Sequence, residues 1–486
     1  MHLRSGLVLP QPAPQGGAGS LSRPQRIPGD GNGDGEDRIS GLPEGLLLDV
    51  LGRLGSSREA ARTSLISRRW CGLWAELREL TFTFRGIRTD PLEIALAQVR
   101  PGLRRLYISN LEEEDHDDGE EGHFISTSER LSSLFRTADR LAPAELVVSI
   151  DTRFRFECCK LPCFRRATII DLHLPGASNV ELSPAGEFAS LEELIIWFGF
   201  VDLSELIDRC PRLRKLRVNL GCSIRNRVSI DSKSLEELTL DCLLTKDVVI
   251  VAPELKKFEF LFGYYGESTI SLSAPKLEEF FLLYLYESSV VGYDNNWFLE
   301  RLRMETRWGD RHKQLSLSLT VLSAHREGVI SKRTFAQEVA RLRVNQFSGL
   351  ELSIRTEGHV FASLLLHMFL IRTSIQRLKL VLKDKSFKKC SENCDCDQDG
   401  SWRNERISLP DLEDVEIEGF SAADHEVDVL ELILRSAPML KRINVKFSAE
   451  VSQSDGRCQK LRSIFQANAA VECNVYDRSS DLISFP

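Results

Sequence analysis

The 486-residue sequence lacks any run of about eighteen apolar residues, which is the length that a membrane-spanning helix needs. It also lacks a basic excess, because 63 Lys and Arg residues stand against 71 Asp and Glu residues and leave a net charge of −8. Nucleic acids and anionic membranes attract strongly basic surfaces. The overall composition therefore predicts neither a nucleic acid nor a membrane as partner.

Recognisable catalytic motifs are missing as well. The nine histidines are scattered, and the chain contains no H-E-x-x-H pair, no G-x-S-x-G elbow and no phosphate-binding loop with its lysine. No cofactor is predicted. The sequence therefore favours a protein that does not itself catalyse a reaction.

The first residues offer little to bury. Residues 1–36 are rich in Pro, Gly and Gln and are predicted to be disordered. The apolar stretch at 7–9 is too short for a signal peptide and is halted by Pro10. Without an export signal, the twelve cysteines are expected to be reduced thiols rather than a disulfide framework. The expected location is the cytoplasm, the nucleus or both.

The stretch from Asp37 to Ala75 is predicted to form three short helices with more apolar surface than so small a unit can bury. Four apolar residues recur at the spacing of one helix face: Leu47, Val50, Leu51 and Leu54. Pro43 stands in the first turn of this helix, and Ser57 is expected to cap the next one. The same spacing recurs further on: Trp70, Leu73, Trp74 and Leu77. We predict a docking partner, the alternative being packing on the rest of the chain.

The same stretch resembles the F-box in the form that plant proteins carry. It has DRIS-x-LP near its start and S-RRW-x-x-LW near its end. The resemblance implies binding to a Skp-type adaptor and, through it, to a cullin and a RING protein. The residues that the resemblance places at the adaptor are Leu42, Pro43, Leu47, Val50, Leu51, Leu54 and Trp70.

A second pattern, L-x-x-[LF]-x-apolar, recurs at intervals of 20 or 22 residues. Its clear copies begin at Leu191, Leu213, Leu235, Leu255, Leu277 and Leu299, and weaker copies begin at Leu103, Ile375, Leu412 and Leu440. This period is typical of leucine-rich repeats, with one strand in each copy. The pattern predicts parallel strands in register, with the fourth and sixth positions in the core and the third and fifth facing outward on a concave surface.

The third positions of the clear copies alternate in sign: Glu193, Lys215, Glu237, Lys257, Glu279 and Arg301. On stacked strands about 4.8 Å apart, each charge would have opposite charges on both sides. Exposed pairs of this kind contribute only about 0–1 kcal/mol each. Their predicted effect is to favour one register and to leave the face without a single sign of charge.

The segments between the strands differ in character. Leu203, Leu206 and Ile207 predict a helical turn, whereas the sequence DCLLTKDVVIVAPEL after Leu240 predicts a second strand. We therefore expect an irregular, open solenoid and not a regular ring.

Residues 411–445 are similar to the FBD region of plant F-box proteins with leucine-rich repeats. The similarity lies in VEI-x-GF at 415–420 and in AP-x-LK-x-I at 437–443. Between these segments, four residues keep helical spacing: Val427, Leu430, Leu434 and Ala437. The predicted unit is strand, helix, strand, and we expect it to cap the open end of the solenoid.

Two loops carry residues with possible chemistry. The acidic run 112–121 holds eight acids and no base and is predicted to be a solvated loop, the alternative being capture of a basic partner. A polar loop contains three thiols: Cys390, Cys394 and Cys396. Zinc needs a fourth ligand, and the C-x3-C-x-C spacing has no second half, so no metal is predicted. Three cysteines form a similar cluster, Cys158, Cys159 and Cys163, in which Cys158 or Cys159 is expected to be a small buried residue.

These features predict an α/β fold in which a three-helix F-box precedes an irregular leucine-rich-repeat solenoid capped by an FBD-like unit. The predicted division of the chain is 1–36 disordered, 37–80 F-box, 81–385 solenoid with the acidic loop, 386–406 polar Cys-containing loop, 407–450 FBD-like region and 451–486 C-terminal segment.

Two classes of function fit this organisation. The first is the substrate receptor of an SCF-type (Skp-cullin-F-box) ubiquitin ligase, and the second is a non-degradative interaction scaffold. A small-ligand receptor on the same solenoid would need a pocket, which the alternating charges argue against. The outward fifth positions are the predicted target surface: Ile195, Arg217, Thr239, Glu259, Phe281 and Arg303. The alternative for Phe281 is ordinary packing against Phe260 or Tyr284. The sequence does not identify the target.

Overall fold

The structure is a computed structural model, and it describes residues 41–85, 90–111, 123–151, 156–175, 177–197, 199, 201–219, 225–241, 245–262, 269–287, 290–294, 296–308, 313–323, 331–341, 347–383, 402–403, 405–448 and 456–477. The chain divides into two compact units, Met1–Leu213 and Arg214–Pro486, hereafter unit 1 and unit 2. Segment 1–36, the acidic run 112–121 and the cysteines of the polar loop lie outside the described residues. Among the described helices, none is long and apolar enough to cross a membrane.

Unit 1 begins with a short helical segment. Its elements are α1 (Glu44–Gly52), α2 (Ser57–Arg62) and the 3-10 helices η1 (Thr63–Leu65) and η2 (Leu73–Glu76). The predicted third α-helix is wrong, because Trp70 lies in a turn and Gly72, at φ = 81°, has a left-handed conformation that ends any helical run. The predicted cap is also wrong by one residue. Ser56 caps α2 by accepting a hydrogen bond from the Glu59 backbone N–H at 3.5 Å.

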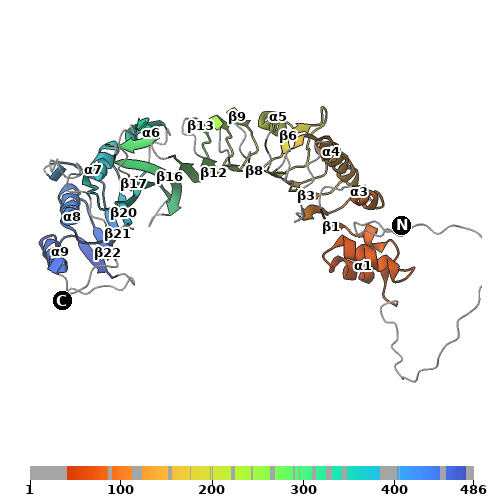
Figure 1. The fold of residues 1–486 in the computed structure, drawn as a ribbon, viewed down its shortest axis with the longest axis horizontal. Coiled ribbons are helices and arrows are strands. Elements are labelled where there is room, and N and C mark those ends of the chain that lie inside the picture. Colours follow the sequence, from red (N-terminus) through yellow and green to blue (C-terminus); the bar gives the residue numbers. More distant parts are fainter. Residues whose placement is uncertain are drawn as a thin grey trace, which may run out of the picture. The chain divides into compact units, whose positions relative to one another are not determined.

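The remainder of unit 1 is a sheet covered on one face. Its strands are β1 (Glu79–Arg85), β2 (Arg105–Leu111), β3 (Glu145–Ser149), β5 (Ile169–His173) and β7 (Glu193–Trp197), paired in that order and all parallel. The covering layer holds α3 (Asp90–Ala97), α4 (His123–Leu141), α5 (Leu203–Asp208) and the pair β4 (Phe156–Leu161) and β6 (Ala177–Leu182) (Figure 1). Alternate residues, such as Leu146 and Val148, are buried against this layer, and the others lie on the open face.

Unit 2 has a longer sheet of mixed direction. Four parallel strands come first: β8 (Lys215–Asn219), β10 (Glu237–Asp241), β12 (Lys257–Phe262) and β14 (Glu279–Leu285). The next strand, β16 (Trp297–Trp308), is antiparallel both to β14 and to β17 (Lys313–Ser323). Parallel pairing then resumes from β17 onward through β19 (Gly349–Arg355), β20 (Arg377–Lys383), β21 (Asp414–Phe420), β22 (Arg442–Phe447) and β23 (Glu472–Tyr476).

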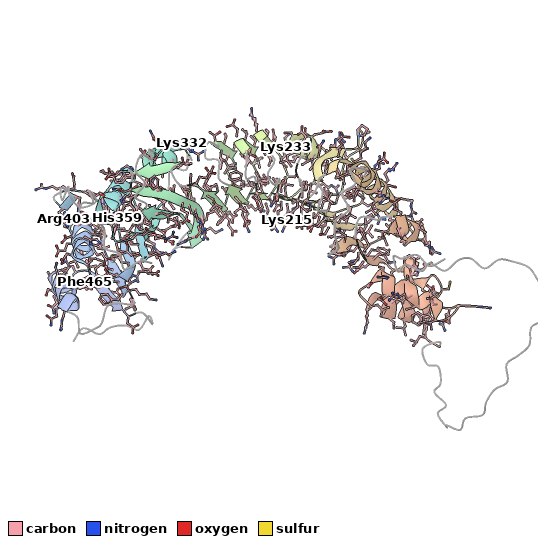
Figure 2. The ribbon with its side chains drawn as sticks, viewed as in Figure 1. Lys215, Lys233, Lys332, His359, Arg403 and Phe465 are labelled. Atoms are coloured by element: carbon pink, nitrogen blue, oxygen red, sulfur yellow. The ribbon has the colours of Figure 1, made fainter. Side chains whose placement is uncertain are left out.

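One side of this sheet is covered. The covering elements are α6 (Phe335–Arg341), α7 (Ala362–Ile371), α8 (Asp424–Ser436), α9 (Gly456–Ala467) and a second sheet of β9 (Arg225–Asp231), β11 (Thr245–Val251) and β13 (Thr269–Ser273) (Figure 1). The short strands β15 (Val291–Tyr293) and β18 (Arg333–Thr334) pair with each other, and β15 also pairs with β16. Figure 2 shows Lys215 on the open side of unit 2 and Lys233 on the covered side.

Much of the predicted pattern is present. The molecule is a mixed α/β protein with a large sheet, as leucine-rich repeats predict, and the helical turn after Leu203 and the second strand after Leu240 are confirmed as α5 and β11. The order β21, α8, β22 is the predicted strand, helix, strand. This unit does not end the sheet, however, because β23 pairs with β22 in the residues predicted only as a C-terminal segment.

The repeat at Leu299 differs most from the prediction. Its strand, β16, runs antiparallel to β14. Parallel strands need a crossover of a dozen or more residues. The connection 286–296 is shorter than the 242–256 segment that joins β10 to β12, so the chain turns back and starts β16 beside the end of β14.

Candidate interaction surfaces

Helix α1 divides its apolar residues between two faces. Leu47 and Leu51 are 0% and 1% exposed and Trp70 is 6% exposed, so these three side chains form the interior of the helical segment. Val50 and Leu54 are instead 44% and 45% exposed. The single stripe expected from the sequence is therefore two stripes, and only one of them faces outward.

The outward stripe includes a residue that the sequence interpretation missed. Leu46 is 47% exposed and lies four residues before Val50 and eight residues before Leu54. At this spacing the three side chains lie near one side of α1 and of the turn that follows it. Leu46, Val50 and Leu54 are hereafter the α1 stripe. Two further apolar residues, Leu65 and Ile66, are 66% and 70% exposed at the end of η1. The sequence signal for Leu65 and Ile66 was an apolar pair between two helices. The prediction missed this pair because it used only apolar residues at helical spacing.

The remaining predicted adaptor residues lie at the start of α1. Pro43 is exposed directly before the helix, and its carbonyl oxygen accepts hydrogen bonds from the backbone N–H groups of Leu46 and Leu47 at 3.0 and 3.2 Å. Leu42 is half-buried, and its carbonyl oxygen accepts a hydrogen bond from Arg69. This contact joins the two ends of the segment that carry the resemblance, LP and RRW, in one small unit.

The helical segment is anchored on the first strand of the sheet. The Ser57 hydroxyl, buried in this contact, accepts a hydrogen bond from the Thr81 backbone N–H at 2.8 Å. The rings of Trp74 and Phe82 meet edge to face with centroids 6.4 Å apart. Because these groups are buried, the segment packs as part of unit 1 and has its free apolar surface elsewhere, on the α1 stripe.

The open face of unit 2 carries the predicted charge ladder over four strands. Lys215 lies opposite Glu237, Glu237 opposite Lys257, and Lys257 opposite Glu279. Lys215 and Glu237 form an ion pair at 3.0 Å, and a hydrogen bond to Glu259, supported by Glu279 and Glu237, raises the pKa of Lys257. The register prediction is confirmed for these four residues. Glu193 lies on the open face of unit 1, opposite Ile169 on β5.

The prediction for Arg301 is wrong. Because β16 is antiparallel, Arg301 lies opposite Leu285 at the far end of β14, and not beside Glu279. The leucines two positions before the ladder residues are buried at five of the six repeats: Leu191, Leu213, Leu235, Leu255 and Leu299. Leu277 is half-buried.

The fifth positions form a second row on the same face. Thr239 lies opposite both Arg217 and Glu259, and Glu259 lies opposite Phe281. Ile195 occupies the corresponding position on β7 of unit 1. The structure therefore brings Arg217, Thr239, Glu259 and Phe281 together.

Arg303 also lies beside this row, although its strand, β16, is antiparallel to β14. The antiparallel register pairs it with Leu283, and Glu305 is the residue opposite Phe281. The Arg303 guanidinium still lies over the Phe281 ring, 5.2 Å from its centroid. Phe260 and Tyr284, the alternative partners of Phe281, are buried on the covered side and meet each other at 6.5 Å.

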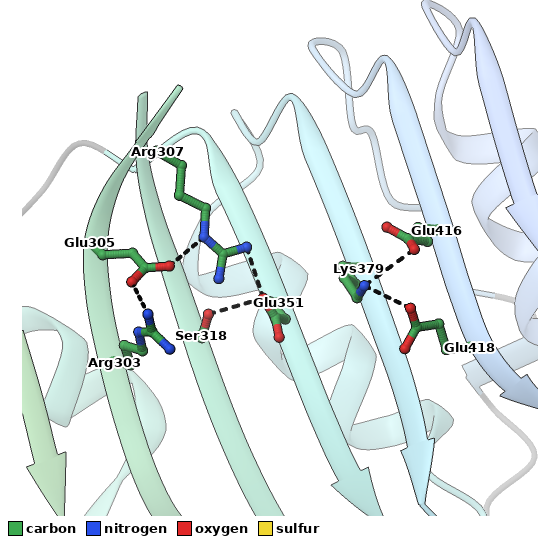
Figure 3. A network of polar contacts seen from close by, with 8 residues as sticks. All are labelled: Arg303, Glu305, Arg307, Ser318, Glu351, Lys379, Glu416 and Glu418. Atoms are coloured by element: carbon green, nitrogen blue, oxygen red, sulfur yellow. Dashed lines mark hydrogen bonds and ion pairs between the residues drawn. The ribbon is translucent and has the colours of Figure 1, made fainter. Parts of the chain in front are cut away.

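Beyond the switch in strand direction, ion pairs continue across the open face. Figure 3 shows Glu305 between Arg303 and Arg307, with Arg307 reaching Glu351 on β19 at 3.0 Å. The Ser318 hydroxyl donates to Glu351 at 3.3 Å. The third positions of the later strands also alternate in sign, since Asp414 contacts Arg442 at 2.9 Å and Arg377 at 3.5 Å.

Lys379 is the centre of the last part of this network. Its ammonium group lies 3.2 Å from Glu416 and 2.8 Å from Glu418, both on β21 (Figure 3). Partial burial alone would lower the pKa of Lys379, but the hydrogen bonds to the two carboxylates raise it. The open face of unit 2 thus carries both signs of charge in matched pairs, which does not suit a polyanion.

In the described part of unit 2, hollows open on this face at two places that bear on ligand binding. One of about 370 Å³ opens where small residues interrupt the charged rows, at Ser316 and Gly349, and its rim includes Arg377, Lys379 and Asp414. The other, of about 280 Å³, has Phe280 and Phe281 at its wall, beside the point where β14 and β16 separate. Both are bordered by charges of both signs, so neither selects a ligand by charge.

The described cysteine cluster is not arranged as a metal site. Burial raises the pKa of Cys159 to about 12 and also raises the pKa of Cys158 and Cys163, which disfavours the thiolate that binds metal. In the part of the chain that the structure describes, no group of three or more His, Cys, Asp or Glu side chains is placed to hold a metal ion. Cys163 instead lines a hollow of about 430 Å³ in unit 1, together with Arg165 and Arg166.

The strand pairing and the covered and open faces define a mixed α/β protein with a large sheet, which is consistent with a protein of the leucine-rich-repeat type. No protein-family model matches the chain. A putative FBD-associated F-box protein of Arabidopsis thaliana is 23% identical over 458 residues, which span 90% of this chain and 92% of the relative. An F-box/FBD/LRR-repeat protein of the same plant is 23% identical over 446 residues, 85% of this chain and 91% of the relative.

A rice protein gives a shorter match of higher identity. The meiotic F-box protein MOF of Oryza sativa subsp. japonica is 36% identical over 249 residues, which span 48% of each chain. Over most of its length the chain is thus similar to plant proteins named for an F-box, an FBD region and leucine-rich repeats. The resemblance predicted from the sequence is confirmed.

Proposed function

We propose that this protein is the substrate-receptor subunit of an SCF-type ubiquitin ligase. The observation that carries the proposal is the α1 stripe, an exposed apolar row on the segment that resembles an F-box, in a chain that also presents open sheet faces. Plant relatives named for an F-box together with an FBD region, leucine-rich repeats or both support the same role. The proposed complex works in the cytoplasm, the nucleus or both.

In this role the chain makes and breaks no bonds. The adaptor connects it to a cullin and a RING protein, which carry the ubiquitin-conjugating enzyme. By holding a target on one of its surfaces, the receptor raises the effective concentration of a target lysine beside that enzyme. Catalysis thus belongs to other subunits.

The proposed adaptor site uses the predicted residues in two ways. Pro43, Val50 and Leu54 are exposed and would contact the adaptor directly, together with Leu46. Leu42 is half-buried at the edge of this surface. The buried members of the predicted set keep α1 in place: Leu47, Leu51 and Trp70.

The proposed target site lies on the open faces of the two sheets. Its predicted residues are Ile195 in unit 1 and Arg217, Thr239, Phe281 and Arg303 in unit 2. The contact of Arg303 with Phe281 supports this proposal, because an aromatic ring with a guanidinium on it forms a preorganised contact surface.

Substitution of the exposed stripe tests the adaptor site. The double variant Val50→Asp/Leu54→Asp places charges on the α1 stripe, one within α1 and one in the turn that follows it, and we expect it to lose the adaptor in a pull-down while its thermal unfolding is unchanged. Leu370→Asp is the matched control, since Leu370 is 71% exposed on α7 of unit 2. Undiminished adaptor binding by the double variant would refute the assignment.

The core of α1 needs a separate measurement. Leu51→Asp buries a charge in the helical segment, so it is expected to unfold the segment and to lose the adaptor for that reason.

The half-life of a bound target distinguishes a receptor from a non-degradative scaffold. With the Val50→Asp/Leu54→Asp variant, the target of a receptor is stabilised, whereas the target of a scaffold keeps its half-life.

A further inference from the structure

The hollow of about 430 Å³ in unit 1, hereafter the unit 1 hollow, takes no part in the surfaces proposed so far. Its described lining residues fall in three segments that the fold brings together: 139–143 at the end of α4, 162–166 between β4 and β5, and 183–186 after β6. Figure 1 shows α4 and β6 in the layer that covers the unit 1 sheet. None of these described residues belongs to a strand of that sheet, so the hollow is separate from its open face.

Two consecutive arginines give the unit 1 hollow its charge. Arg165 and Arg166 both line it, and both are exposed. Among the described residues, no carboxylate forms an ion pair or a hydrogen bond with either guanidinium. Arg209 differs, because it donates to the Ser183 carbonyl oxygen and forms an ion pair with Glu205. Arg165 and Arg166 therefore keep donors for a ligand, whereas Arg209 stabilises the wall.

Close backbone packing shapes the walls around these arginines. A Cβ at Gly102 would lie 3.3 Å from Nη1 of Arg166, so the Arg166 guanidinium lies against backbone. A Cβ at Gly186 would lie 3.2 Å from Cβ of Cys163, so the connection after β6 packs directly on the connection between β4 and β5. The hollow is thus formed by fixed backbone on two sides and does not depend on flexible side chains there.

Asp139 is the one acid among the described lining residues. Burial raises the pKa of its carboxyl, and the positive charge of Arg165 opposes this shift. Beyond the lining, Glu187 is the acid that follows the last lining segment, and Arg136 and Arg140 stand near Asp139 on α4. Bases therefore outnumber acids both in the lining and in the segments that carry it, and the hollow favours an anion.

The arrangement suits a phosphate monoester better than a carboxylate. A planar guanidinium donates two parallel hydrogen bonds to either group. A single carboxylate occupies one such fork, whereas a phosphate monoester carries about 1.5 to 2 negative charges and three acceptor oxygens and can engage two forks. The volume of about 430 Å³ lies within the range of about 300–1,000 Å³ that is usual for ligand pockets. The unit 1 hollow thus has the size and the donors for a phosphate and the side chain that carries it.

The exposure of the two arginines favours a phosphate that is carried by a protein. A pocket for a small molecule encloses most of its ligand. Arg165, Arg166 and Ala185 are instead exposed at the rim, so a free phosphate compound would remain largely in water. A phosphorylated side chain brings its own chain segment onto this rim, and the segment gains further contacts there.

We propose that the unit 1 hollow binds a phosphorylated Ser or Thr side chain of the target protein. Arg165 and Arg166 donate hydrogen bonds to the phosphate oxygens, and the flanking residues of the target lie on the rim. The inference rests on the proposed receptor function and makes phosphorylation a condition of target capture. The open sheet faces contact other parts of the same target.

Peptide libraries with and without the phosphate test the proposal. Immobilised full-length protein is exposed to a library of short random peptides with a central phosphoserine, and to matched libraries with serine or glutamate at that place. We expect the phosphoserine library to be retained at least about tenfold more than the serine library. The glutamate library should stay close to the serine library, because one carboxylate does not engage both guanidiniums. The retained phosphopeptides are then made synthetically and their affinities measured.

Variants of the hollow give the second readout. Arg165→Ala/Arg166→Ala should weaken the retained phosphopeptides by about tenfold or more and leave the melting temperature unchanged, because both side chains are exposed. Arg227→Ala/Lys233→Ala is the matched control, since it removes two exposed positive charges from unit 2 and should leave the affinity unchanged. The proposal is overturned if the serine or glutamate library is retained as well as the phosphoserine library. Undiminished binding by the hollow variant, or an equal loss in the control, also overturns it.

Free phosphate compounds separate the two sources of the ligand. Inorganic phosphate and phosphoserine as the free amino acid should displace the phosphopeptides only at concentrations far above those of the peptides themselves. If either compound binds as tightly as the peptides, the hollow takes a small phosphorylated molecule and its assignment to the target is wrong.

The test does not depend on the adaptor. The Val50→Asp/Leu54→Asp variant should retain the same phosphopeptides, because the α1 stripe does not line the hollow, and Arg165→Ala/Arg166→Ala should keep the adaptor. If the α1 stripe proves unnecessary for adaptor binding while the phosphopeptides behave as expected, the proposed function is wrong and the phosphate site stands. If adaptor binding behaves as proposed and no library is preferred, only the phosphate site is wrong.

Discussion

At the scale of single residues, the carboxylate of Glu338 is buried and makes several polar contacts. It is 0% exposed on α6 and accepts hydrogen bonds from the Tyr286 hydroxyl at 2.8 Å and from Nε of Arg341 at 3.1 Å. Arg333 forms a further ion pair with it at 3.0 Å. Burial, followed by the nearby Glu338 carboxylate, raises the pKa of Tyr286 well above its usual value, so the phenol stays protonated and donates.

Glu338→Ala is therefore expected to destabilise unit 2 strongly. It leaves two guanidinium groups without their shared carboxylate in a site with little water, at a cost of about 3–5 kcal/mol. Urea denaturation measures the change in the free energy of unfolding. Glu431→Ala, an exposed change on α8, is the control and should cost well under 1 kcal/mol. A loss of less than about 1 kcal/mol in Glu338→Ala would show that water replaces the carboxylate.

A second buried carboxylate predicts a pH dependence. Glu426 is 7% exposed in the first turn of α8, and burial raises its pKa above 4.5 although the Ser421 backbone N–H donates to it at 2.8 Å. A raised pKa in the folded state means that folding favours the protonated form. The contribution to stability is complete below pH 4.5 and is lost as the pH rises through the folded-state pKa.

Glu426→Gln should accordingly raise the melting temperature at pH 7, where the wild-type chain buries a charge. The gain should vanish below pH 4.5, where the wild-type side chain is protonated and resembles the amide. Thermal unfolding at pH 4 and pH 7 measures both values. A lower melting temperature of Glu426→Gln at pH 7 would indicate that attraction between the carboxylate and the start of α8 outweighs its burial.

The division of α1 into a buried and an exposed stripe shows where sequence interpretation stops at this scale. The spacing of Leu47, Val50, Leu51 and Leu54 correctly predicted a helix with apolar residues on it. It could not separate the residues that meet Trp70 and the rest of the helical segment from those that face outward. That separation depends on how α2, η1 and η2 pack against α1, and periodicity within one helix contains no information on it.

At the scale of elements, sequence periodicity predicted strand positions well and strand direction less well. Each clear copy of the repeat from Leu191 to Leu277 gives a strand that begins two residues after its first leucine. The copy at Leu299 has the same hexamer and yet belongs to an antiparallel strand. The hexamer encodes alternation of buried and exposed residues, which both directions share, whereas direction depends on the length and path of the preceding connection.

The charge ladder predicts a measurable effect on the element that it spans. Glu237→Lys would place three ammonium groups on adjacent strands β8, β10 and β12, and we expect a loss of about 1 kcal/mol in the free energy of unfolding at low salt. The loss should shrink in about 1 M salt, where screening is nearly complete. Urea denaturation at both salt concentrations measures it. Glu431→Lys, on an exposed helix face, is the control, and a salt-independent loss at Glu237 would point to packing and not to charge.

At the scale of the whole molecule, the helical segment and the sheet of unit 1 are one packed structure. Ser57 and Trp74 contact β1, and Phe82 is only 9% exposed because Trp74 lies beside it. The sequence predicted a boundary after residue 80 from the end of the F-box motif. Hydrophobic periodicity is a property of each element by itself, so it does not show that the helical segment covers part of β1.

This packing changes how partners should be assigned. A comparison of the full chain with residues 81–486 is the obvious way to separate adaptor-dependent partners from targets. Removal of residues 1–80 deletes Ser57 and Trp74, however, and it leaves the Thr81 backbone N–H and the Phe82 ring to solvent. We expect the truncated chain to melt several degrees below the full chain, because losing a buried Trp alone costs about 3–5 kcal/mol. The Val50→Asp/Leu54→Asp chain should keep the melting temperature of the full protein.

Affinity purification from the native source with the proteasome blocked then measures which partners each of these chains keeps. The adaptor and cullin should be absent from the Val50→Asp/Leu54→Asp sample, while targets held on the open sheet faces remain. The 81–486 sample should lose the ligase subunits and also some of the targets that need unit 1. If the truncated chain instead melts with the full chain and keeps every target, the contacts of Trp74 and Ser57 contribute little to stability, and the helical segment is a separate domain after all.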